Sequence, residues 1–95
     1  MKIGPHNFQR PIATAACIAI GTASPSWDVQ ESVEEEVPPR RDMTDEIMKL
    51  ERGWYTPSEK PGLGVLFNEK APAMHPFNPA NAPAPIREDG SVALK

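Results

Sequence analysis

The sequence is poor in the residue types that several kinds of protein need. Its 95 residues include one cysteine, Cys17, which excludes an internal disulfide and a cysteine-based metal cluster. No apolar run approaches the roughly 20 residues that a membrane-spanning helix requires. The net charge is -3, without the basic excess that is typical of nucleic-acid-binding proteins. We therefore expect neither a membrane nor a nucleic acid as a partner.

Large aliphatic side chains are also scarce, whereas proline is abundant. The length suits one small domain, and a chain of this size buries only a modest core even with an ideal composition. Of the 12 prolines, those at positions 72, 76, 79, 83 and 85 follow Ala71 and predict irregular structure there. In particular, we expect Pro72 to interrupt a short helix in the segment "NEKAPAM".

The first part of the chain, residues 1–41, predicts a loop, a helix, a strand and an exit loop. Pro11 suits the first turn of a helix over residues 12–23, because the N–H that it lacks is not needed there. Ile and Ala recur at helical spacing in this range, and Gly21 and Pro25 mark the end. Trp27–Glu31 is predicted as a short strand. The following "EEEVPPRR" segment, residues 34–41, reads as a solvated connection.

The second part, residues 42–95, is predicted as a tail with little regular structure. Thr44 or Asp42 could cap a short helix over residues 45–50. The segments "GWYTP" and "GLGVLF" are predicted as two short strands, and Trp54 and Tyr55 are expected to pack the tail against the rest of the protein. His75 has no Cys, Asp or second His at a spacing usable for a metal, so we do not interpret it as a ligand.

An alternative interpretation is an exported, largely disordered, proline-rich binding protein with a signal peptide. Lys2 and Arg10 would be the charged start, residues 12–20 the apolar middle and residues 21–23 the cleavage site. Against it, the middle is rich in Ala and Thr and contains no Leu, and the polar start is unusually long.

Three segments together resemble one enzyme family. "PHNFQRPIATAACIAIGTASPSWDVQE" resembles the seventh-to-eighth strand unit of the enolase superfamily, in its mandelate racemase/muconate lactonizing branch. "KPGLGVLFNEK", residues 60–70, resembles a C-terminal segment of the same family, and "REDGSVA", residues 87–93, resembles the tail of its acid-sugar dehydratases, such as galactonate and mannonate dehydratases. The resemblance implies an α/β fold, namely the C-terminal piece of a (β/α)-barrel followed by an irregular proline-rich tail, incomplete as a fold by itself.

The resemblance also implies a chemistry, proton abstraction next to a carboxylate followed by loss of water. His6 would be the general acid/base, and Glu31 would hydrogen-bond the substrate carboxylate. The two lie 25 residues apart, a spacing that suits one loop–helix–strand repeat and places both at the same rim of the barrel.

Further expectations follow from the family. Such enzymes combine a Lys or His base with Mg²⁺, but the metal ligands and lysine bases lie on strands that precede this segment. We therefore expect no metal ligands in this chain and no activity from it alone. The complete enzyme is expected to be a cytoplasmic homo-oligomer acting on a sugar acid.

Overall fold

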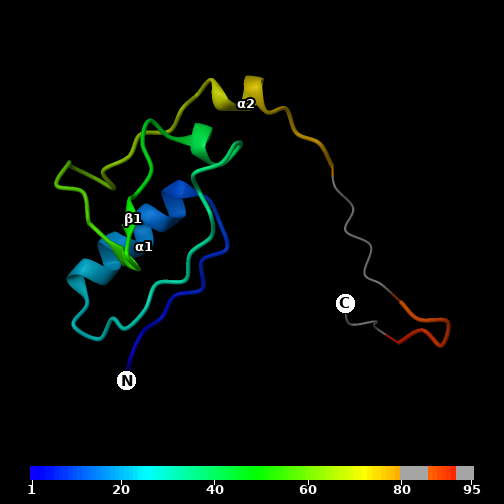
Figure 1. Ribbon diagram of the computed structural model, residues 1–95, viewed down its shortest axis with the longest axis horizontal. Helices are drawn as coiled ribbons and strands as arrows, with labels where there is room; N and C mark the ends of the chain where they lie inside the picture. Colours follow the sequence, from blue (N-terminus) through cyan, green and yellow to red (C-terminus); the bar gives the residue numbers. More distant parts are fainter. Residues whose placement is uncertain (80–85, 92–95) are drawn as a thin grey trace.

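The computed structural model describes residues 1–79 and 86–91 of the chain. Its elements, in chain order, are helix α1 (Pro11–Ala23), the 3₁₀ turn η1 (Arg41–Met43), strands β1 (Leu50–Glu51) and β2 (Trp54–Tyr55), and helix α2 (Ala71–Met74) (Figure 1). The predictions made for Pro83, Pro85 and residues 92–93 lie outside the described residues.

Helix α1 confirms the helix predicted from residue 12 and starts one residue earlier. Pro11 occupies the first position, and the carbonyl of Arg10 accepts hydrogen bonds from the N–H groups of Ala13 (2.9 Å) and Thr14 (3.2 Å). One face of the helix is buried and carries Thr14, Ala15 and Ile18. Residues 12–20, considered above as the apolar part of a signal peptide, lie within this helix.

The chain on either side of α1 pairs in parallel at one point. Ile3 and Trp27 form an isolated parallel bridge, in which the N–H of Ile3 donates to Ser26 O (2.8 Å) and the N–H of Asp28 donates to Ile3 O (2.9 Å). The predicted strand over Trp27–Glu31 was wrong in extent, because within this range only Trp27 forms a bridge. A strand needs hydrogen bonds to a neighbouring strand along its length. A parallel pair joined through a helix is nevertheless the repeating unit of an α/β barrel.

The segment after η1 differs from the prediction. The helix expected over residues 45–50 is absent; instead β1 and β2 form an antiparallel hairpin, with Leu50 opposite Tyr55. Its turn is Arg52–Gly53, where both residues have positive φ (52° and 83°), a conformation that favours glycine. The "GWYTP" strand is thus confirmed in part, with a partner that the sequence did not indicate.

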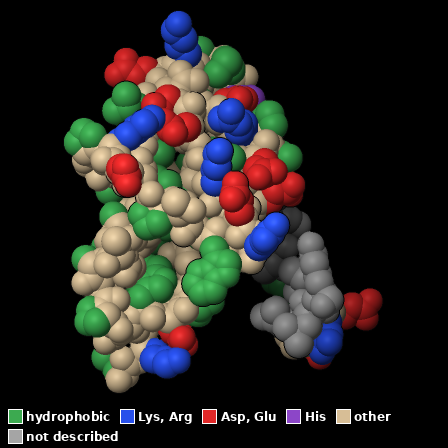
Figure 2. All heavy atoms as spheres, turned by 60° about the vertical axis from the view of Figure 1, so that its left-hand side comes forward, with side chains coloured by type: hydrophobic (Ala, Val, Ile, Leu, Met, Phe, Trp, Pro, Cys, Tyr) green, Lys and Arg blue, Asp and Glu red, His purple; other side chains and the backbone are tan. Residues whose placement is uncertain are grey.

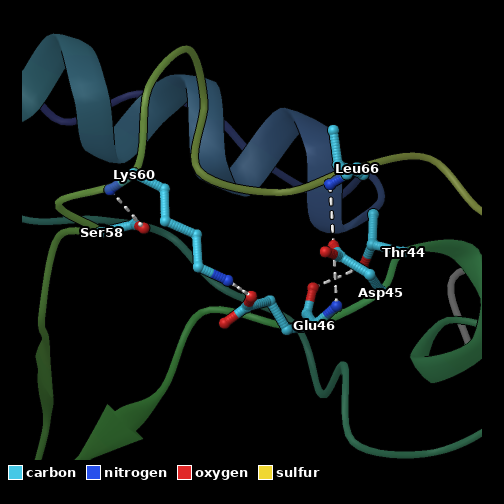
Figure 3. A network of polar contacts seen from close by, with 6 residues as sticks. All are labelled: Thr44, Asp45, Glu46, Ser58, Lys60 and Leu66. Carbon is cyan, nitrogen blue, oxygen red and sulfur yellow. Dashed lines mark hydrogen bonds and ion pairs between the residues drawn. The ribbon is translucent and has the colours of Figure 1, made fainter.

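Local polar contacts explain why residues 45–50 are not helical. The Asp45 carboxylate accepts hydrogen bonds from the N–H groups of Glu46 (2.9 Å) and Leu66 (2.8 Å), which ties this segment to a distant loop (Figure 3). Lys60 of that loop also pairs with Glu46. Aspartate side chains that bond the nearby backbone compete with helix formation.

The predicted "GLGVLF" strand was also wrong. Gly62 and Gly64 both have positive φ, outside the strand region, and only Phe67 pairs, in an antiparallel bridge with Thr44. The expectation that Pro72 interrupts a short helix was wrong as well. Pro72 lies in the first turn of helix α2, where no N–H donor is required. The rule that prolines forbid regular structure after Ala71 was therefore too strict.

The hydrophobic core of the described residues is small. Ala15, Ile18 and Met48 form one buried cluster, against which Tyr55 and Val65 pack, whereas Trp54 is 79% exposed. Other hydrophobic side chains lie on the surface among charged ones (Figure 2). Among the described residues, no helix is long and apolar enough to span a membrane.

Candidate active site at His6 and Glu31

The structure brings the two predicted site residues together. His6 follows the paired residue Ile3, and Glu31 follows the paired residue Trp27, so both lie beyond the same end of the two parallel segments. His6 Nε2 is 3.8 Å from Glu31 Oε2. With Gly4, they help line an open cavity of about 390 Å³. The placement expected from the 25-residue spacing is thus present in the structure, whereas the catalytic roles stay predictions.

Both side chains are accessible. The His6 side chain is 83% exposed and that of Glu31 is 45% exposed. The distance of 3.8 Å between His6 Nε2 and Glu31 Oε2 is longer than a hydrogen bond. The two groups are therefore not locked to each other in a hydrogen-bonded ion pair. The arrangement leaves an imidazole and a carboxylate side by side at an open depression of the surface.

Asn7 holds the Glu31 carboxylate through the main chain. The N–H of Asn7 donates a hydrogen bond of 2.6 Å to Glu31 Oε2, and the Asn7 side-chain amide donates a weaker one to the Glu31 carbonyl (3.4 Å). A backbone N–H bonded to a carboxylate is a charge-assisted contact, stronger than a neutral one. The residue directly after His6 therefore fixes the orientation of Glu31.

A buried polar chain runs behind these contacts. Asn7 Nδ2 donates to Thr14 Oγ1 (2.9 Å), and the Thr14 hydroxyl donates to Glu35 Oε1. Asn7, Thr14 and Glu35 are almost completely buried. Burial raises the pKa of the Glu35 carboxyl above its ordinary value of 4.5, although its bond with Thr14 and the nearby charge of Arg40 act in the opposite direction.

Glu35 corrects the interpretation of residues 34–41 as a solvated loop. Most of that segment is exposed, as predicted, but Glu35 is only 5% exposed. The sequence reasoning missed Asn7, Thr14 and Glu35 as members of one network. The available signals were slight: a threonine near the start of a mostly small and apolar helix, and an acid among three in a row.

The described residues do not fit a metal ion. In residues 1–79 and 86–91, no three His, Cys, Asp or Glu side chains come together in a way that could hold one. His75 lies against Asp42, with Nε2 2.7 Å from Oδ2, and the two together offer too few ligands. The Mg²⁺ that the family resemblance implies would need ligands from other strands, and no step below is assigned to it.

The parallel pairing on either side of α1, with His6 and Glu31 beyond the same end of it, fits a piece of an α/β barrel. Residues 1–71 match a family described as enolase C-terminal domain-like. The chain therefore belongs to the enolase C-terminal domain-like family, and the resemblance inferred from its sequence is confirmed.

Curated relatives support the same assignment. A D-galactonate dehydratase family member from Streptomyces bingchenggensis is 33% identical over 94 residues, which cover 97% of this chain and 23% of the relative. Another from Chromohalobacter salexigens is 30% identical over 93 residues, covering 94% of this chain and 22% of the relative. The chain thus spans about a quarter of the length of these relatives.

Solved structures agree. One is described as a mandelate racemase/muconate lactonizing enzyme from Burkholderia SAR-1. It superposes on this chain with a TM-score of 0.71 at 28% sequence identity, and the match covers 78% of this chain and 18% of that protein's chain. A second, from Labrenzia alexandrii, gives a TM-score of 0.69 at 30% identity, over 80% of this chain and 20% of its own. Both matches are consistent with this chain being a piece of an α/β barrel.

Proposed function

We propose that this chain supplies the His6–Glu31 part of the active site of an acid-sugar dehydratase-like enzyme, in a barrel completed by further strands. The observation that carries the proposal is the 3.8 Å approach of His6 to Glu31 beyond the same end of two parallel segments. The relatives described as D-galactonate dehydratase family members support the dehydratase assignment.

His6 would transfer the proton. Its imidazole accepts the proton of the carbon next to the substrate carboxylate, and the electron pair of the broken C–H bond moves into an enediolate. The imidazolium then gives its proton to the hydroxyl on the adjacent carbon, and that hydroxyl leaves as water when the C–O bond breaks. An exposed imidazole in an open cavity is accessible for both transfers.

Glu31 would bind the substrate carboxylate as it gains enediolate character. Its Oε2 already accepts the N–H of Asn7, whereas Oε1 makes no hydrogen bond within residues 1–79 and 86–91. The free oxygen is therefore the one that, when it carries a proton, would donate a hydrogen bond to the substrate carboxylate. Such a contact strengthens as negative charge develops, which lowers the barrier rather than merely binding substrate.

The remaining parts of the proposal rest on the family resemblance alone. The complete enzyme would act on a sugar acid, in the cytoplasm and as a homo-oligomer. Since this chain covers about a quarter of its relatives, we expect the isolated chain to be inactive.

A hybrid barrel tests the proposal. The Streptomyces bingchenggensis relative would carry this chain in place of its own matching segment, and turnover of a panel of acid sugars would be followed through the keto-acid product. His6→Asn should lower kcat by about 10²–10⁴-fold, the usual contribution of general acid–base catalysis. His75→Asn is the matched control, because it removes the other of the two histidines, and it should retain activity.

Two outcomes would overturn the proposal. One is a folded hybrid, verified by circular dichroism, that turns over no acid sugar in the panel. The other is an active hybrid in which His6→Asn and His75→Asn have the same kcat.

A further inference from the structure

The polar chain behind the candidate site joins three separate parts of the sequence. Asn7 belongs to the loop that carries His6, Thr14 to the first turns of α1, and Glu35 to the segment after Glu31. The exposed fractions of these three residues are 1%, 0% and 5%. Nothing in the proton transfer described above uses Thr14 or Glu35.

The direction of the hydrogen bonds makes the chain dependent on each member. Asn7 Nδ2 can only donate, so Thr14 Oγ1 accepts from it and directs its own proton to Glu35 Oε1. Removing the threonine hydroxyl would leave the amide of Asn7 without this acceptor in a buried position. Only the longer contact with the Glu31 carbonyl (3.4 Å) would remain, and a poorly satisfied buried donor is costly, so Asn7 would move to find a better acceptor.

A movement of Asn7 would reach the site directly. Its main-chain N–H donates to Glu31 Oε2 at 2.6 Å. Asn7 also directly follows His6 in the sequence, so a shift of Asn7 moves the His6 backbone. Asn7 therefore anchors both the loop that carries His6 and the segment that carries Glu31, and Thr14 fixes Asn7 to α1. Small displacements of catalytic groups cost large factors in rate.

We propose that Thr14 and Glu35 are positioning residues, which hold Asn7 and through it set the relative placement of His6 and Glu31. This inference rests on the proposed function for its catalytic consequence, but the anchoring itself can be measured without activity. Thr14 and Glu35 touch no substrate in this scheme; they act only through Asn7.

The test compares matched variants in the hybrid barrel. Thr14→Val keeps the shape of the side chain and deletes the hydroxyl, whereas Thr14→Ser keeps the hydroxyl. Thr22→Val is the control on the same helix, because the Thr22 hydroxyl donates to Ile18 O (2.9 Å), outside the network. Glu35→Gln retains an acceptor oxygen, and Glu35→Leu removes it.

Two readouts are recorded for each variant. The first is kcat and KM. The second is amide hydrogen exchange by mass spectrometry of the peptide between Pro5 and Pro11, which contains the Asn7 N–H. Thr14→Val and Glu35→Leu should lower kcat by about 10–100-fold with KM changed about twofold or less, and should speed exchange in this peptide. Thr14→Ser, Glu35→Gln and Thr22→Val should stay close to the parent in both.

The outcomes separate this inference from the proposed function. Unchanged exchange in Thr14→Val overturns the anchoring, and faster exchange with an unchanged kcat overturns the positioning role. A fall in kcat of the same size in Thr22→Val would also overturn it, since general destabilisation of α1 would then suffice. If the parent hybrid has no turnover, the proposed function fails, while the exchange comparison still decides whether Thr14 and Glu35 hold Asn7.

Discussion

Asn7 and Glu31, 24 residues apart, are joined by a main-chain hydrogen bond of 2.6 Å from the Asn7 N–H to Glu31 Oε2. The bond links the two loops that carry the candidate site. It engages one carboxylate oxygen, Oε2, whereas Oε1 makes no hydrogen bond within residues 1–79 and 86–91.

The first prediction concerns that carboxylate. In the hybrid barrel, Glu31→Gln should lower kcat by about 10–100-fold, because the amide that replaces Oε1 can still donate a hydrogen bond but is too weak an acid to shift a proton toward the developing enediolate. The amide oxygen can still accept from the Asn7 N–H, so the loop should keep its conformation. Steady-state kinetics should show a larger effect on kcat than on KM.

The neighbouring exposed acid supplies the control for this variant. Glu34→Gln changes the net charge equally but lies outside the Asn7 contacts and should be close to the parent. If the Glu31 and Glu34 variants had equal rates, Glu31 would be an ordinary surface acid.

The second prediction is a pH dependence of stability from Glu35. Because burial raises the pKa of this carboxyl above 4.5, the folded state binds more protons than the unfolded state over the interval just above that pH. Stability contributed by Glu35 is therefore complete below about pH 4.5 and is lost as the pH rises through the raised pKa. Thermal unfolding of the hybrid and its Glu35→Gln variant, from pH 4 to 8, measures this.

The difference between the two unfolding curves isolates the group. The variant cannot ionise at position 35, so its melting temperature should rise relative to the parent as the pH increases. A difference that is constant with pH, or that runs the other way, contradicts an elevated pKa for Glu35.

The third prediction concerns the packing of Trp27 on α1. A Cβ added at Gly21 would lie 2.7–2.9 Å from atoms of the Trp27 ring, closer than such contacts occur. Gly→Ala within a helix normally stabilises by about 0.5–1 kcal/mol, but here overpacking, typically about 1–3 kcal/mol, should dominate. Gly21→Ala should therefore lower the stability of the hybrid in urea unfolding.

The clash can be separated from other effects by removing the ring. In a Trp27→Leu background, Gly21→Ala should become neutral or stabilising, because only the helix preference remains. Destabilisation of equal size in both backgrounds would show that the ring is not the cause.

The fourth prediction is that the isolated 95-residue chain does not unfold cooperatively. Helix α1 has 13 residues, and helices shorter than about 12–15 residues are marginal in water without packing. Among the described residues, the buried hydrophobic side chains are few, namely Ala15, Ile18, Met48 and Ala71. Circular dichroism should show a weak helical signal with a broad thermal change, whereas the hybrid barrel should melt sharply. A sharp transition of the isolated chain, with exchange-protected amides in α1, would mean that it folds as a domain.

The sequence by itself determined the features that depend on neighbouring residues. Helix α1 followed from Pro11, a helical spacing and Gly21, because helix formation is governed within a few residues along the chain. The approach of His6 to Glu31 was predicted from a loop–helix–strand spacing and a family resemblance, and the structure places them 3.8 Å apart.

Only the tertiary structure decided the features that depend on distant partners. Asp45 is held by the N–H of Leu66, 21 residues away, so its segment is not the helix that local signals favoured. Glu35 is buried in a run of acids because Thr14, also 21 residues away, supplies a hydrogen bond. A carboxylate is buried only where a hydrogen-bond partner compensates for the loss of its hydration. The tertiary structure decides which residue supplies that partner.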